Sequence, residues 1–473
     1  MTPIPPGRLA ELLGEWRRGG GAADRLAATL RALVLDGRIA LHARLPPERA
    51  LAAALGLSRA TVTAAYDRLR SEGYIASRQG AGSWVTIPAQ GRAEGDELHD
   101  FQGLDLRIAA LPAPAAVGEL AVAAAGDLTR WLDHHGYNAL GLPPLRSAIA
   151  ARFTTRGLPT RPDQILVTSG ALQALDLAIR ALLPRGRAAL AEIPSYPVAL
   201  DALRASAARL HAAPVSPAGW DLEALEAVAR AHRPALAYLM PDFHNPTGQL
   251  LDEGGRRRAL RALARAGTAA VIDETFVELN LDGRAMPAPA AAWGGASAIT
   301  VGGLSKSVWG GLRVGWARAE PEIVHRLAAA RATSDMASPV LEQLLAARVL
   351  ECLDDLLAER LPLLRARRAA LLGALARELP RWTAGAPSGG MFLWAQLPEP
   401  ISTSLSVLAA ERGVAVTPGP RFGAAAGLLE RYLRLPFTLA PEQLERAVSV
   451  LAQVVPVAAG ERQAADARLQ YVA

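Results

Sequence analysis

The sequence predicts a multidomain protein in which a small N-terminal helical domain precedes a large α/β domain with a mostly parallel sheet. Within residues 24–88, helical patterns meet at a glycine and two short strand patterns follow. From about residue 111 to 456, helical stretches alternate with short apolar runs that end in turn residues. A chain of 473 residues is also long enough for two or three domains.

Composition sets limits on the class of protein. Hydrophobic residues make up 51% and charged residues 20%, which predicts a globular chain rather than a disordered one. The single cysteine, Cys352, excludes an intramolecular disulfide framework and a cysteine-cluster metal site, and we predict no metal. The N-terminus lacks an apolar signal core, and charged residues interrupt each apolar stretch before about 18 residues. We therefore expect a cytoplasmic protein without a membrane partner.

Composition changes along the chain predict its domain boundaries. We place a first domain at 1–88, with its core at 24–88, and a linker at 89–110 that lacks a sustained period. The large domain covers 111–456, with a smaller C-terminal subdomain at about 340–456. A polar, alanine-rich tail over 457–473 is expected to be loose.

The first domain begins with a helix whose apolar residues share one face: Leu26, Leu30, Leu33 and Val34. Asp24 is suited to cap its start and Gly37 to end it. Nine arginines and five acidic residues give residues 24–88 a charge of +4, out of +6 for the whole chain.

The next segment has a helix-turn-helix pattern. A short helix over about 48–55 is followed by Gly56, and a second helix begins at the N-cap Ser58 and ends near Gly73. The run YIASRQGAGSWVT then predicts strand, glycine turn and strand, with Arg78 and Gln79 at the tip.

The polar residues of this segment are placed to contact DNA. The Ser58 cap exposes Arg59, Thr61 and Thr63 on the first turns of the second helix, the end that enters the major groove in helix-turn-helix proteins. Arginine binds guanine edges or phosphates through two N–H groups, and threonine hydroxyls hold phosphate. Arg49 on the preceding helix would lie near the DNA backbone. The alternative is that these are ordinary solvated helix faces.

The run LPPERALAAALGLSRATVTAAYDRL, with the following GYI and RQGAG, resembles the winged helix-turn-helix of GntR-type bacterial regulators over about 60 residues. That resemblance implies that the protein binds double-stranded operator DNA. It places Arg49, Arg59, Thr61, Thr63, Arg78 and Gly80 at positions that usually touch DNA.

A single lysine is the most informative residue of the large domain. Of 51 basic residues, only Lys306 is lysine. An amine that loses its proton attacks a carbonyl, whereas a guanidinium stays protonated. In GGLSKSVWGGLRVGW, glycines surround Lys306, so that its amine can reach a bound aldehyde, and Arg313 follows seven residues later to clamp a phosphate.

Four further motifs end strands or open helices in the same domain. Asp273 ends the apolar run AVID, where a carboxylate can pair with a pyridinium nitrogen. Asn245 of HNPTG can donate to a ring phenolate oxygen, and Ser169-Gly170-Ala171 opens a helix whose N–H groups can bind a phosphate. Arg434 in RYLRLPF can hold a ligand carboxylate at two points. Each motif alone is compatible with a structural role, but all follow strands, where α/β sheets bind ligands.

This order of motifs resembles the class I aminotransferases of fold type I, which use pyridoxal 5'-phosphate (PLP), over about 345 residues. The resemblance implies that Lys306 forms the internal aldimine, Asp273 pairs with the pyridine nitrogen, Asn245 contacts the ring oxygen and Tyr196 stacks on the ring. Arg313, Ser169, Gly170, Ala171 and Ser305 would hold the phosphate. Tyr137 would reach the phosphate of the neighbouring subunit, which implies a homodimer.

Two residues depart from that pattern. Phe276 stands where these enzymes commonly have a tyrosine that donates to the ring oxygen, and Thr275 is a shorter substitute. Gly303 stands where a serine or threonine often helps to hold the phosphate. Losing one hydrogen bond to a charged group costs about 1.5–3 kcal/mol, so we expect binding to survive and turnover to suffer more.

A GntR-type reader joined to an aminotransferase-like domain resembles the MocR group of bacterial transcription regulators over about residues 24–456. That resemblance implies a PLP-dependent regulator in which an amino compound or PLP itself is the effector. One alternative is a working aminotransferase that carries a DNA-binding domain, and another is a DNA-binding protein with a cofactor-free scaffold. The sequence does not identify the effector, the regulated genes, the operator spacing, or activation against repression.

Overall fold

The computed structural model describes residues 3–13, 21–35, 38–39, 43–78, 82–86, 101–206, 208–423 and 428–470. The chain divides into two compact units. Unit 1 comprises Met1–Ile108, Ala370–Gly385 and Trp394–Ala473, and unit 2 comprises Ala109–Ala369 and Ala386–Leu393. Residues 340–369, which we assigned to the small subdomain, therefore group with the large sheet of unit 2.

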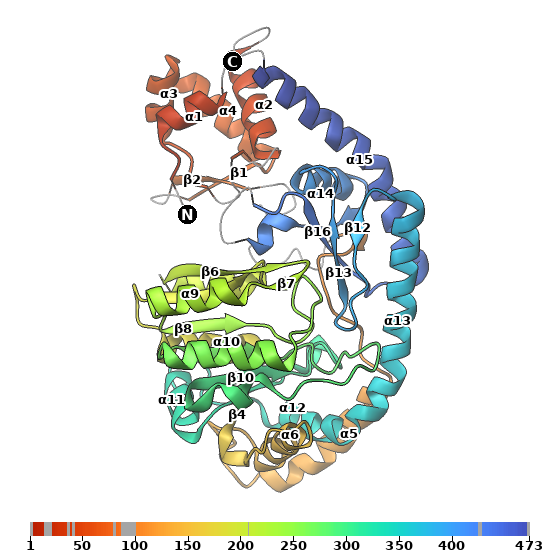
Figure 1. The fold of residues 1–473 in the computed structure, drawn as a ribbon. Helices are drawn as coiled ribbons and strands as arrows, with labels where there is room; N and C mark the ends of the chain where they lie inside the picture. The colour runs from red at the N-terminus through yellow and green to blue at the C-terminus, as the bar shows by residue number, and fades with distance from the viewer. Residues whose placement is uncertain are drawn as a thin grey trace. The chain divides into compact units, whose positions relative to one another are not determined.

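The N-terminal part of unit 1 is the predicted winged helix-turn-helix (Figure 1). Its elements are α1 (Pro6–Leu13), α2 (Ala22–Leu35), α3 (Glu48–Leu55), α4 (Arg59–Ser71), β1 (Ile75–Arg78) and β2 (Gly82–Val85). The turn between α3 and α4 passes through Gly56, whose φ of 60° lies in the left-handed region that glycine adopts without a Cβ penalty.

The helices of this region pack on one apolar core. The predicted face of α2, Leu26, Leu30, Leu33 and Val34, is buried in it. Val62 and Tyr66 of α4 join the same core. Helix α2 begins at Ala22, so Asp24 lies inside its first turn rather than at the N-cap, and its carboxylate pairs with Arg68 of α4 at 2.5 Å. Gly37 lies outside the described residues.

The rest of unit 1 is a small α/β region. Within its described residues, a four-stranded sheet has the order β12 (Thr383–Ala384), β13 (Phe392–Gln396), β16 (Tyr432–Pro436) and β15 (Thr417–Pro418). Its other elements are α14 (Ser402–Glu411), the 3-10 helix η6 (Gly419–Phe422), β14 (Val414–Ala415) and α15 (Pro441–Gln470).

Two predicted loose segments are ordered in this unit. Strand β3 (Leu104–Asp105) falls inside the predicted linker and pairs in parallel with β14, and Leu106, which follows it, is buried. Residues 89–100 lie outside the described residues. The predicted tail is helical to Gln470, since α15 continues through it and alanine favours helix.

Unit 2 is built on an eight-stranded, mostly parallel sheet among the described residues. The strand order is β4 (Ile165–Thr168), β11 (Gly315–Arg318), β10 (Ala298–Gly303), β9 (Ala269–Asp273), β8 (Leu236–Leu239), β5 (Ala188–Ile193), β6 (Arg209–Ser216) and β7 (Gly219–Trp220). Strand β11 runs antiparallel to both β10 and β4, and β7 runs antiparallel to β6, whereas the other described neighbours are parallel. The edge strand β4 and the central strand β8 are fully buried, and central β9 is buried from its second residue on, which explains their continuous apolar runs.

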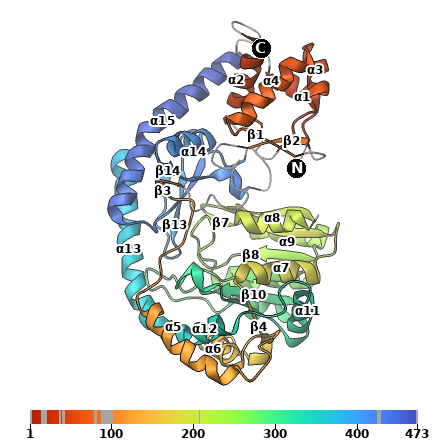
Figure 2. The ribbon, with the colours of Figure 1, turned by 180° about the vertical axis from the view of Figure 1, so that it is seen from behind.

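Helices cover both faces of this sheet. α9 (Leu222–His232) and α10 (Glu253–Arg265) lie in front of it in Figure 1, and α7 (Ala171–Leu182) and α8 (Pro197–Ala205) in the reverse view of Figure 2. The remaining helices are α5 (Ala116–Asp127), α6 (Pro143–Thr155), α11 (Pro321–Arg331), α12 (Val340–Glu351) and α13 (Leu353–Glu378). Short 3-10 helices are η1 (Leu128–Trp131), η2 (Pro162–Gln164), η3 (Ala290–Trp293), η4 (Gly295–Ser297) and η5 (Gly310–Leu312).

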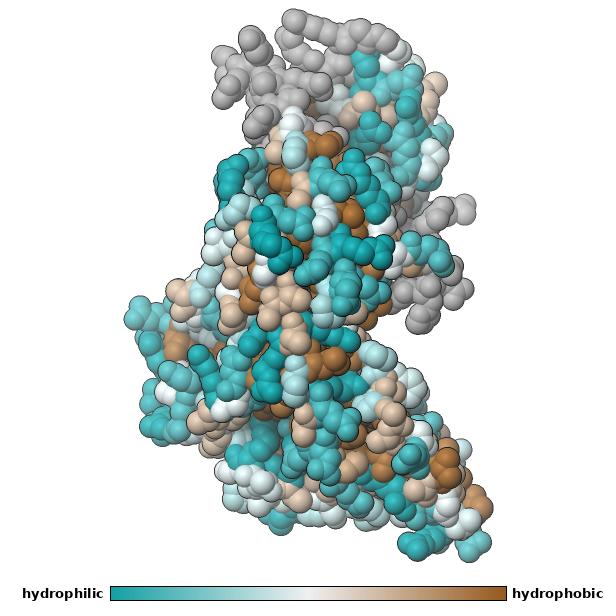
Figure 3. All heavy atoms as spheres, turned by 90° about the vertical axis from the view of Figure 1, so that its right-hand side faces the viewer, coloured by the Kyte–Doolittle hydropathy of each residue, from teal (hydrophilic) through white to brown (hydrophobic). Residues whose placement is uncertain are grey.

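The side of the chain that carries α13 mixes hydrophobic with hydrophilic residues (Figure 3). Single exposed apolar side chains such as Leu363 are ordinary on protein surfaces. Within the described part of the chain, we find no helix whose length and hydropathy would let it cross a bilayer.

A buried ion pair holds α10 to the loop after β8. Arg256 and Asp242 are both fully buried, and their side chains meet at 2.6 Å. We expect Arg256→Ala to destabilise unit 2 by about 3–5 kcal/mol, because Asp242 would remain buried without its partner. Chemical denaturation followed by tryptophan fluorescence measures this. Arg257→Ala is the control, since Arg257 is exposed, pairs with Glu253 of its own helix and lies 6.0 Å from the Trp293 ring centroid; equal losses in the two variants would contradict the prediction.

Candidate functional site

The predicted ligand residues of unit 2 meet at the carboxyl ends of its parallel strands. Asp273 is the last residue of β9 and is buried, and buried Asn245 follows β8. Tyr196 precedes α8 after β5, and Ser305 and Lys306 follow β10; these three are half-buried. Since neighbouring parallel strands end at the same edge, segments far apart in sequence reach one place.

Lys306 lies in the turn that follows β10. Its Nζ donates to the carbonyl of Ala109 at 2.8 Å and lies 5.9 Å from the ring centroid of Phe276. Burial raises the pKa of Asp273, and the hydrogen bonds from Thr275 and Tyr238 and the positive charge of Lys306 oppose that rise only in part. Lys306 and Asp273 therefore share one electrostatic environment.

The carboxylate of Asp273 is held by three donors. Oδ1 accepts from the backbone N–H of Thr275 at 2.9 Å and from its hydroxyl at 2.5 Å. Oδ2 accepts from the Tyr238 hydroxyl at 2.6 Å. The sequence did not suggest Tyr238, because its role depends on the register of two strands.

Neither Thr275 nor Phe276 supplies a free hydroxyl that could donate to a ring oxygen. We considered Thr275 as a substitute donor to a ring oxygen, but its hydroxyl is committed to Asp273. The Phe276 ring packs against Phe392 at a centroid distance of 5.1 Å and carries no donor.

Backbone and arginine groups form the opposite side of the site. Ser169 and Gly170 connect β4 to α7, and Ala171 is the first residue of that helix. The first N–H groups of a helix have no acceptor inside it and attract anions. The Arg313 guanidinium donates to the Ser169 carbonyl at 2.8 Å, which fixes it beside this helix start. The Ser169 N–H itself is taken by Gln173 Oε1 at 2.7 Å.

Glycines allow the close approach of these segments. A Cβ on Gly315 would lie 2.5 Å from the carbonyl carbon of Gly170 and 2.6 Å from the nitrogen of Ala171. A Cβ on Gly303 would lie 2.9 Å from the carbonyl oxygen of Val314. The departure at Gly303 therefore has a steric reason: a serine there would collide with the neighbouring strand.

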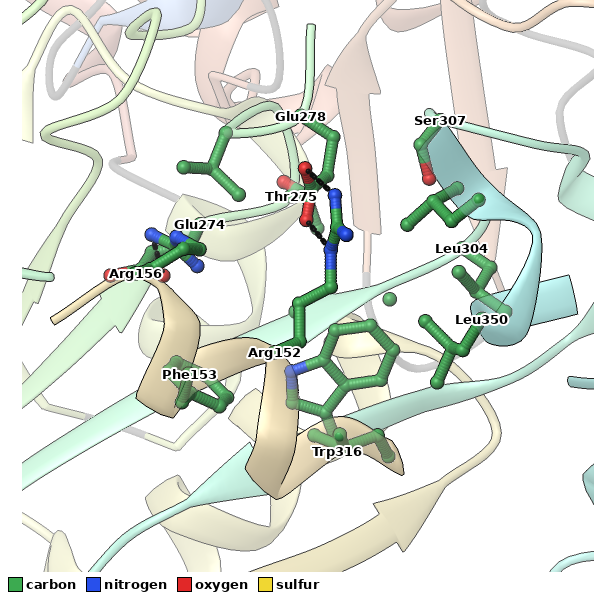
Figure 4. Close-up of a pocket in the computed structure, with 15 residues that line it drawn as sticks. Arg152, Phe153, Arg156, Glu274, Thr275, Glu278, Leu304, Ser307, Trp316 and Leu350 are labelled. Atoms are coloured by element: carbon green, nitrogen blue, oxygen red, sulfur yellow. Dashed lines mark hydrogen bonds and ion pairs between the residues drawn. The ribbon is translucent and has the colours of Figure 1, made fainter. Parts of the chain in front are cut away.

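A cavity lined by apolar and charged side chains includes Leu304 and Ser307, which flank the Lys306 segment (Figure 4). Its lining includes Thr275, Gly303 and Ser307, and the carboxylate of buried Glu274, which pairs with Arg156 at 2.7 Å. Burial raises the pKa of Glu274, and the charge of Arg156 opposes that rise. Lys306, Asp273 and Asn245 are not among the lining residues, so this cavity is separate from the predicted ligand site.

Two predicted ligand residues lie elsewhere. Tyr137 is 64% exposed between η1 and α6, and its contact with a neighbouring subunit remains a prediction. Arg434 lies on β16 in unit 1, where its guanidinium donates to the carbonyl of Arg107 and lies 5.1 Å from the Phe422 ring centroid. Its contact with a ligand carboxylate remains a prediction. No group of three or more His, Cys, Asp or Glu side chains suited to a metal ion occurs in the described ranges.

The predicted DNA-reading residues lie on and beside α4. Ser58 caps the helix, accepting from the Thr61 N–H at 3.1 Å. Arg59, the first residue of α4, has a side chain that is 72% exposed. Arg49 and Arg78 are also exposed, whereas Gly80 and Gln79 lie outside the described residues.

Glu48 is a residue of this surface that sequence reasoning missed. Its Oε2 accepts from the Thr63 hydroxyl at 2.8 Å and lies 3.6 Å from Arg59 Nε. Glu48 thereby ties the start of α3 to the exposed face of α4. The Thr63 hydroxyl is engaged within the protein, and its contact with DNA remains a prediction.

Together, fold and sites define a DNA-reading domain joined in one chain to an aminotransferase-like α/β domain. Residues 112–451 match the aminotransferase class I and II family, and residues 22–85 match the gntR family of bacterial regulatory proteins. The chain belongs to the aminotransferase class I and II family, and it is a GntR-type regulator fused to an aminotransferase-like domain, as in the MocR-type regulators.

Relatives of both kinds support this assignment. The chain is 30% identical over 329 residues to the probable rhizopine catabolism regulatory protein MocR of Rhizobium meliloti, covering 63% of this chain and 65% of that protein. It is 26% identical over 474 residues to the transcriptional regulator TauR of Rhodobacter capsulatus, covering 92% and 97%. The solved structure of the α-aminoadipate aminotransferase LysN of Thermus thermophilus, complexed with N-(5'-phosphopyridoxyl)-L-leucine, has 32% identity and a TM-score of 0.70, covering 78% and 97%.

Proposed function

We propose that this protein is a transcription regulator that binds operator DNA through α4 and binds PLP at Lys306, with an amino compound or PLP as effector. The observation that carries the proposal is the convergence of the chain's only lysine, a buried Asp273 and an open helix start in a protein that also has a DNA reader. A regulator that reads chromosomal DNA acts in the cytoplasm, where we place it.

The residues of unit 2 fit PLP. We call Gly170, Ala171 and Arg313 the phosphate cradle; β11 packs so closely against the start of α7 that a Cβ on Gly315 would overlap the backbone of Gly170 and Ala171. Ala171 and Gly170 would offer N–H groups to the phosphate, and Arg313 its guanidinium. When bound, PLP supplies an aldehyde carbon that amines attack and a ring that withdraws electrons.

Each remaining residue of the site would bind the cofactor or the effector. Lys306 would supply the amine, which in this structure donates a hydrogen bond to the Ala109 carbonyl at 2.8 Å. Asp273 would accept the ring N–H, Asn245 would donate to the ring oxygen, and Tyr196 would stack on the ring. Ser305 would donate to the phosphate. Arg434 would hold the carboxylate of an amino-acid effector.

A homodimer would complete this site through Tyr137. Large apolar side chains of unit 2 are exposed in the single chain: Val122, Leu132, Tyr137, Trp309, Met336 and Leu341. Such exposure supports a second copy as the partner that covers them. Sedimentation of the purified protein should give twice the mass of the 49.7 kDa chain.

A working aminotransferase is the second candidate, and the likeness to LysN is the observation that favours it. The site argues against efficient turnover. Phe276 carries no hydroxyl, and Thr275 is committed to Asp273, so neither supplies the donor that commonly serves the ring oxygen. Multiple turnovers with an amino acid and a 2-oxo acid would establish the enzyme instead.

The deciding experiment is a titration of labelled DNA from upstream of the protein's own coding region. Fluorescence anisotropy would be measured for the PLP-free protein, with PLP, and with PLP plus a panel of amino compounds. We expect salt-sensitive binding whose affinity changes at least several-fold with PLP or with one amino compound. Equal affinity under all conditions, or no specific binding, would exclude a ligand-responsive regulator.

The glycine at 315 provides a test of the phosphate cradle. We expect Gly315→Ala to weaken PLP binding by about tenfold or more and to cost about 1–3 kcal/mol of stability, because the new Cβ overlaps the backbone of Gly170 and Ala171. Gly310→Ala is the matched control, since a Cβ there has no neighbour within 4 Å. Equilibrium dialysis gives both affinities. Equal affinities for the two variants would refute the cradle.

A further inference from the structure

Tyr238 lies behind the cofactor-binding carboxylate without any assigned role. β8 and β9 are parallel neighbours in which Tyr238 pairs with Val271 and Leu239 with Ile272. Side chains at 271 and 273 point to the same face of the sheet, because successive strand residues alternate. The Tyr238 phenol therefore reaches along this face to Asp273, and its hydroxyl donates to Oδ2 at 2.6 Å.

The surroundings keep this phenol a hydrogen-bond donor. Tyr238 is fully buried, and burial together with the negative charge of Asp273 raises its pKa well above the usual value. Tyr196 and Glu192 add to that rise. The phenol therefore stays protonated at neutral pH, where it donates to Asp273.

A carboxylate has about four acceptor positions, two on each oxygen. Thr275 fills both positions of Oδ1 with its N–H and hydroxyl, and Tyr238 fills one position of Oδ2. Among the donors of the described residues, none fills the second position of Oδ2, which we assign to a ligand. The three donors thus determine which oxygen of Asp273 can accept a hydrogen bond from a ligand, and from which direction.

We propose that Tyr238 is a positioning residue that, together with Thr275, orients Asp273 so that its one remaining acceptor position on Oδ2 receives the ring N–H of bound PLP. The inference rests on the proposed function. Its chemical consequence is that the hydroxyls of Tyr238 and Thr275 both stabilise the carboxylate that would face the ring nitrogen, and that neither donates to the ring oxygen. Because these donors stabilise the charged carboxylate, they keep it a weak base and leave the proton on the ring nitrogen.

The experiment uses the full chain loaded with PLP labelled with ¹⁵N in its ring. The ¹⁵N chemical shift reports whether the ring nitrogen carries the proton, and equilibrium dialysis reports affinity. In Tyr238→Phe we expect the ring ¹⁵N signal to move toward that of an unprotonated pyridine and the dissociation constant for PLP to rise about tenfold. Without the phenol, Asp273 is a stronger base and is held from one side only.

Two further comparisons separate positioning from packing. Thr275→Val should shift the signal in the same direction, and Thr275→Ser, which keeps the hydroxyl, should restore it. Tyr66→Phe is the control for losing a buried phenol, because the Tyr66 hydroxyl donates to the Pro46 carbonyl in the DNA-reading region. It should leave both PLP readouts unchanged.

The outcomes distinguish this inference from the proposed function. If the wild type takes up no PLP, the proposed function fails and the inference with it. If the wild type binds PLP but Tyr238→Phe keeps the wild-type ¹⁵N shift and affinity, the positioning role is wrong while the proposed function stands. Should Tyr238→Phe fail to fold, the Thr275→Val and Thr275→Ser pair decides: equal ring signals in those two variants would overturn the inference.

Discussion

Lys306→Ala is expected to abolish covalent attachment of PLP completely. The protein has one lysine in 473 residues, so no other ε-amine in the chain can replace it. Borohydride reduction of the wild type loaded with PLP should fix the cofactor on the peptide that contains Lys306, and the variant should show no labelled side chain by mass spectrometry. The visible band of the imine should disappear with the covalent link and be replaced by the band of the free aldehyde, because Gly170 and Arg313 retain weakened binding.

Lys306→Arg is the matched variant for charge. A guanidinium keeps the positive charge beside Asp273 and can donate to the Ala109 carbonyl, but it does not form an imine. We expect it to lose the visible band as fully as the alanine variant. Both variants should also lose the response of DNA binding to amino compounds. A reduction-stable label at any other side chain, or a ligand response that survives in either variant, would contradict this account.

The positions that sequence could identify share one property: their chemistry follows from residue type at the end of an apolar run. A strand ends at Asp273, and strands precede Asn245 and Lys306. Parallel strands end at the same edge of a sheet whatever their exact register. Tyr238 carries no such signal. It lies inside the apolar run ALAYLMP, where an aromatic residue is an ordinary core residue, and its contact with Asp273 exists only because β8 and β9 pair in one particular register.

Backbone collisions are equally invisible in the sequence. Gly303 seemed to be the loss of a phosphate donor, but the structure shows that a Cβ there meets the backbone of the neighbouring strand. The same limit applies to the segments that we expected to be irregular. Residues 104–105 form a strand because a partner, β14, lies some 310 positions later in the chain, and no local pattern announces a two-residue parallel pair.

Arg59→Ala is expected to weaken binding to operator DNA by about 5- to 150-fold for each reading head, since a bidentate contact to a base is worth about 1–3 kcal/mol. The side chain stands at the start of α4 and projects into solvent, and the 3.6 Å approach of Glu48 restrains it without burying it. Anisotropy titrations against operator and scrambled duplexes at several salt concentrations measure the effect. A base contact predicts a larger loss on the operator than on scrambled DNA, with little change in salt dependence.

A phosphate contact by Arg59 would give a different result, namely equal losses on both duplexes and a salt slope reduced by about one.

Arg68→Ala is the control on the same helix. Its guanidinium pairs with Asp24 at 2.5 Å and with Glu72 at 2.9 Å. Its removal should therefore lower the melting temperature and leave the DNA affinity nearly unchanged. Glu48→Gln adds a third comparison, because it removes the negative charge that faces Arg59 and would otherwise repel phosphate. We expect it to strengthen binding to scrambled DNA more than to operator. If Arg59→Ala binds operator as the wild type does, α4 is not the reading helix and the DNA contacts lie on another part of the domain.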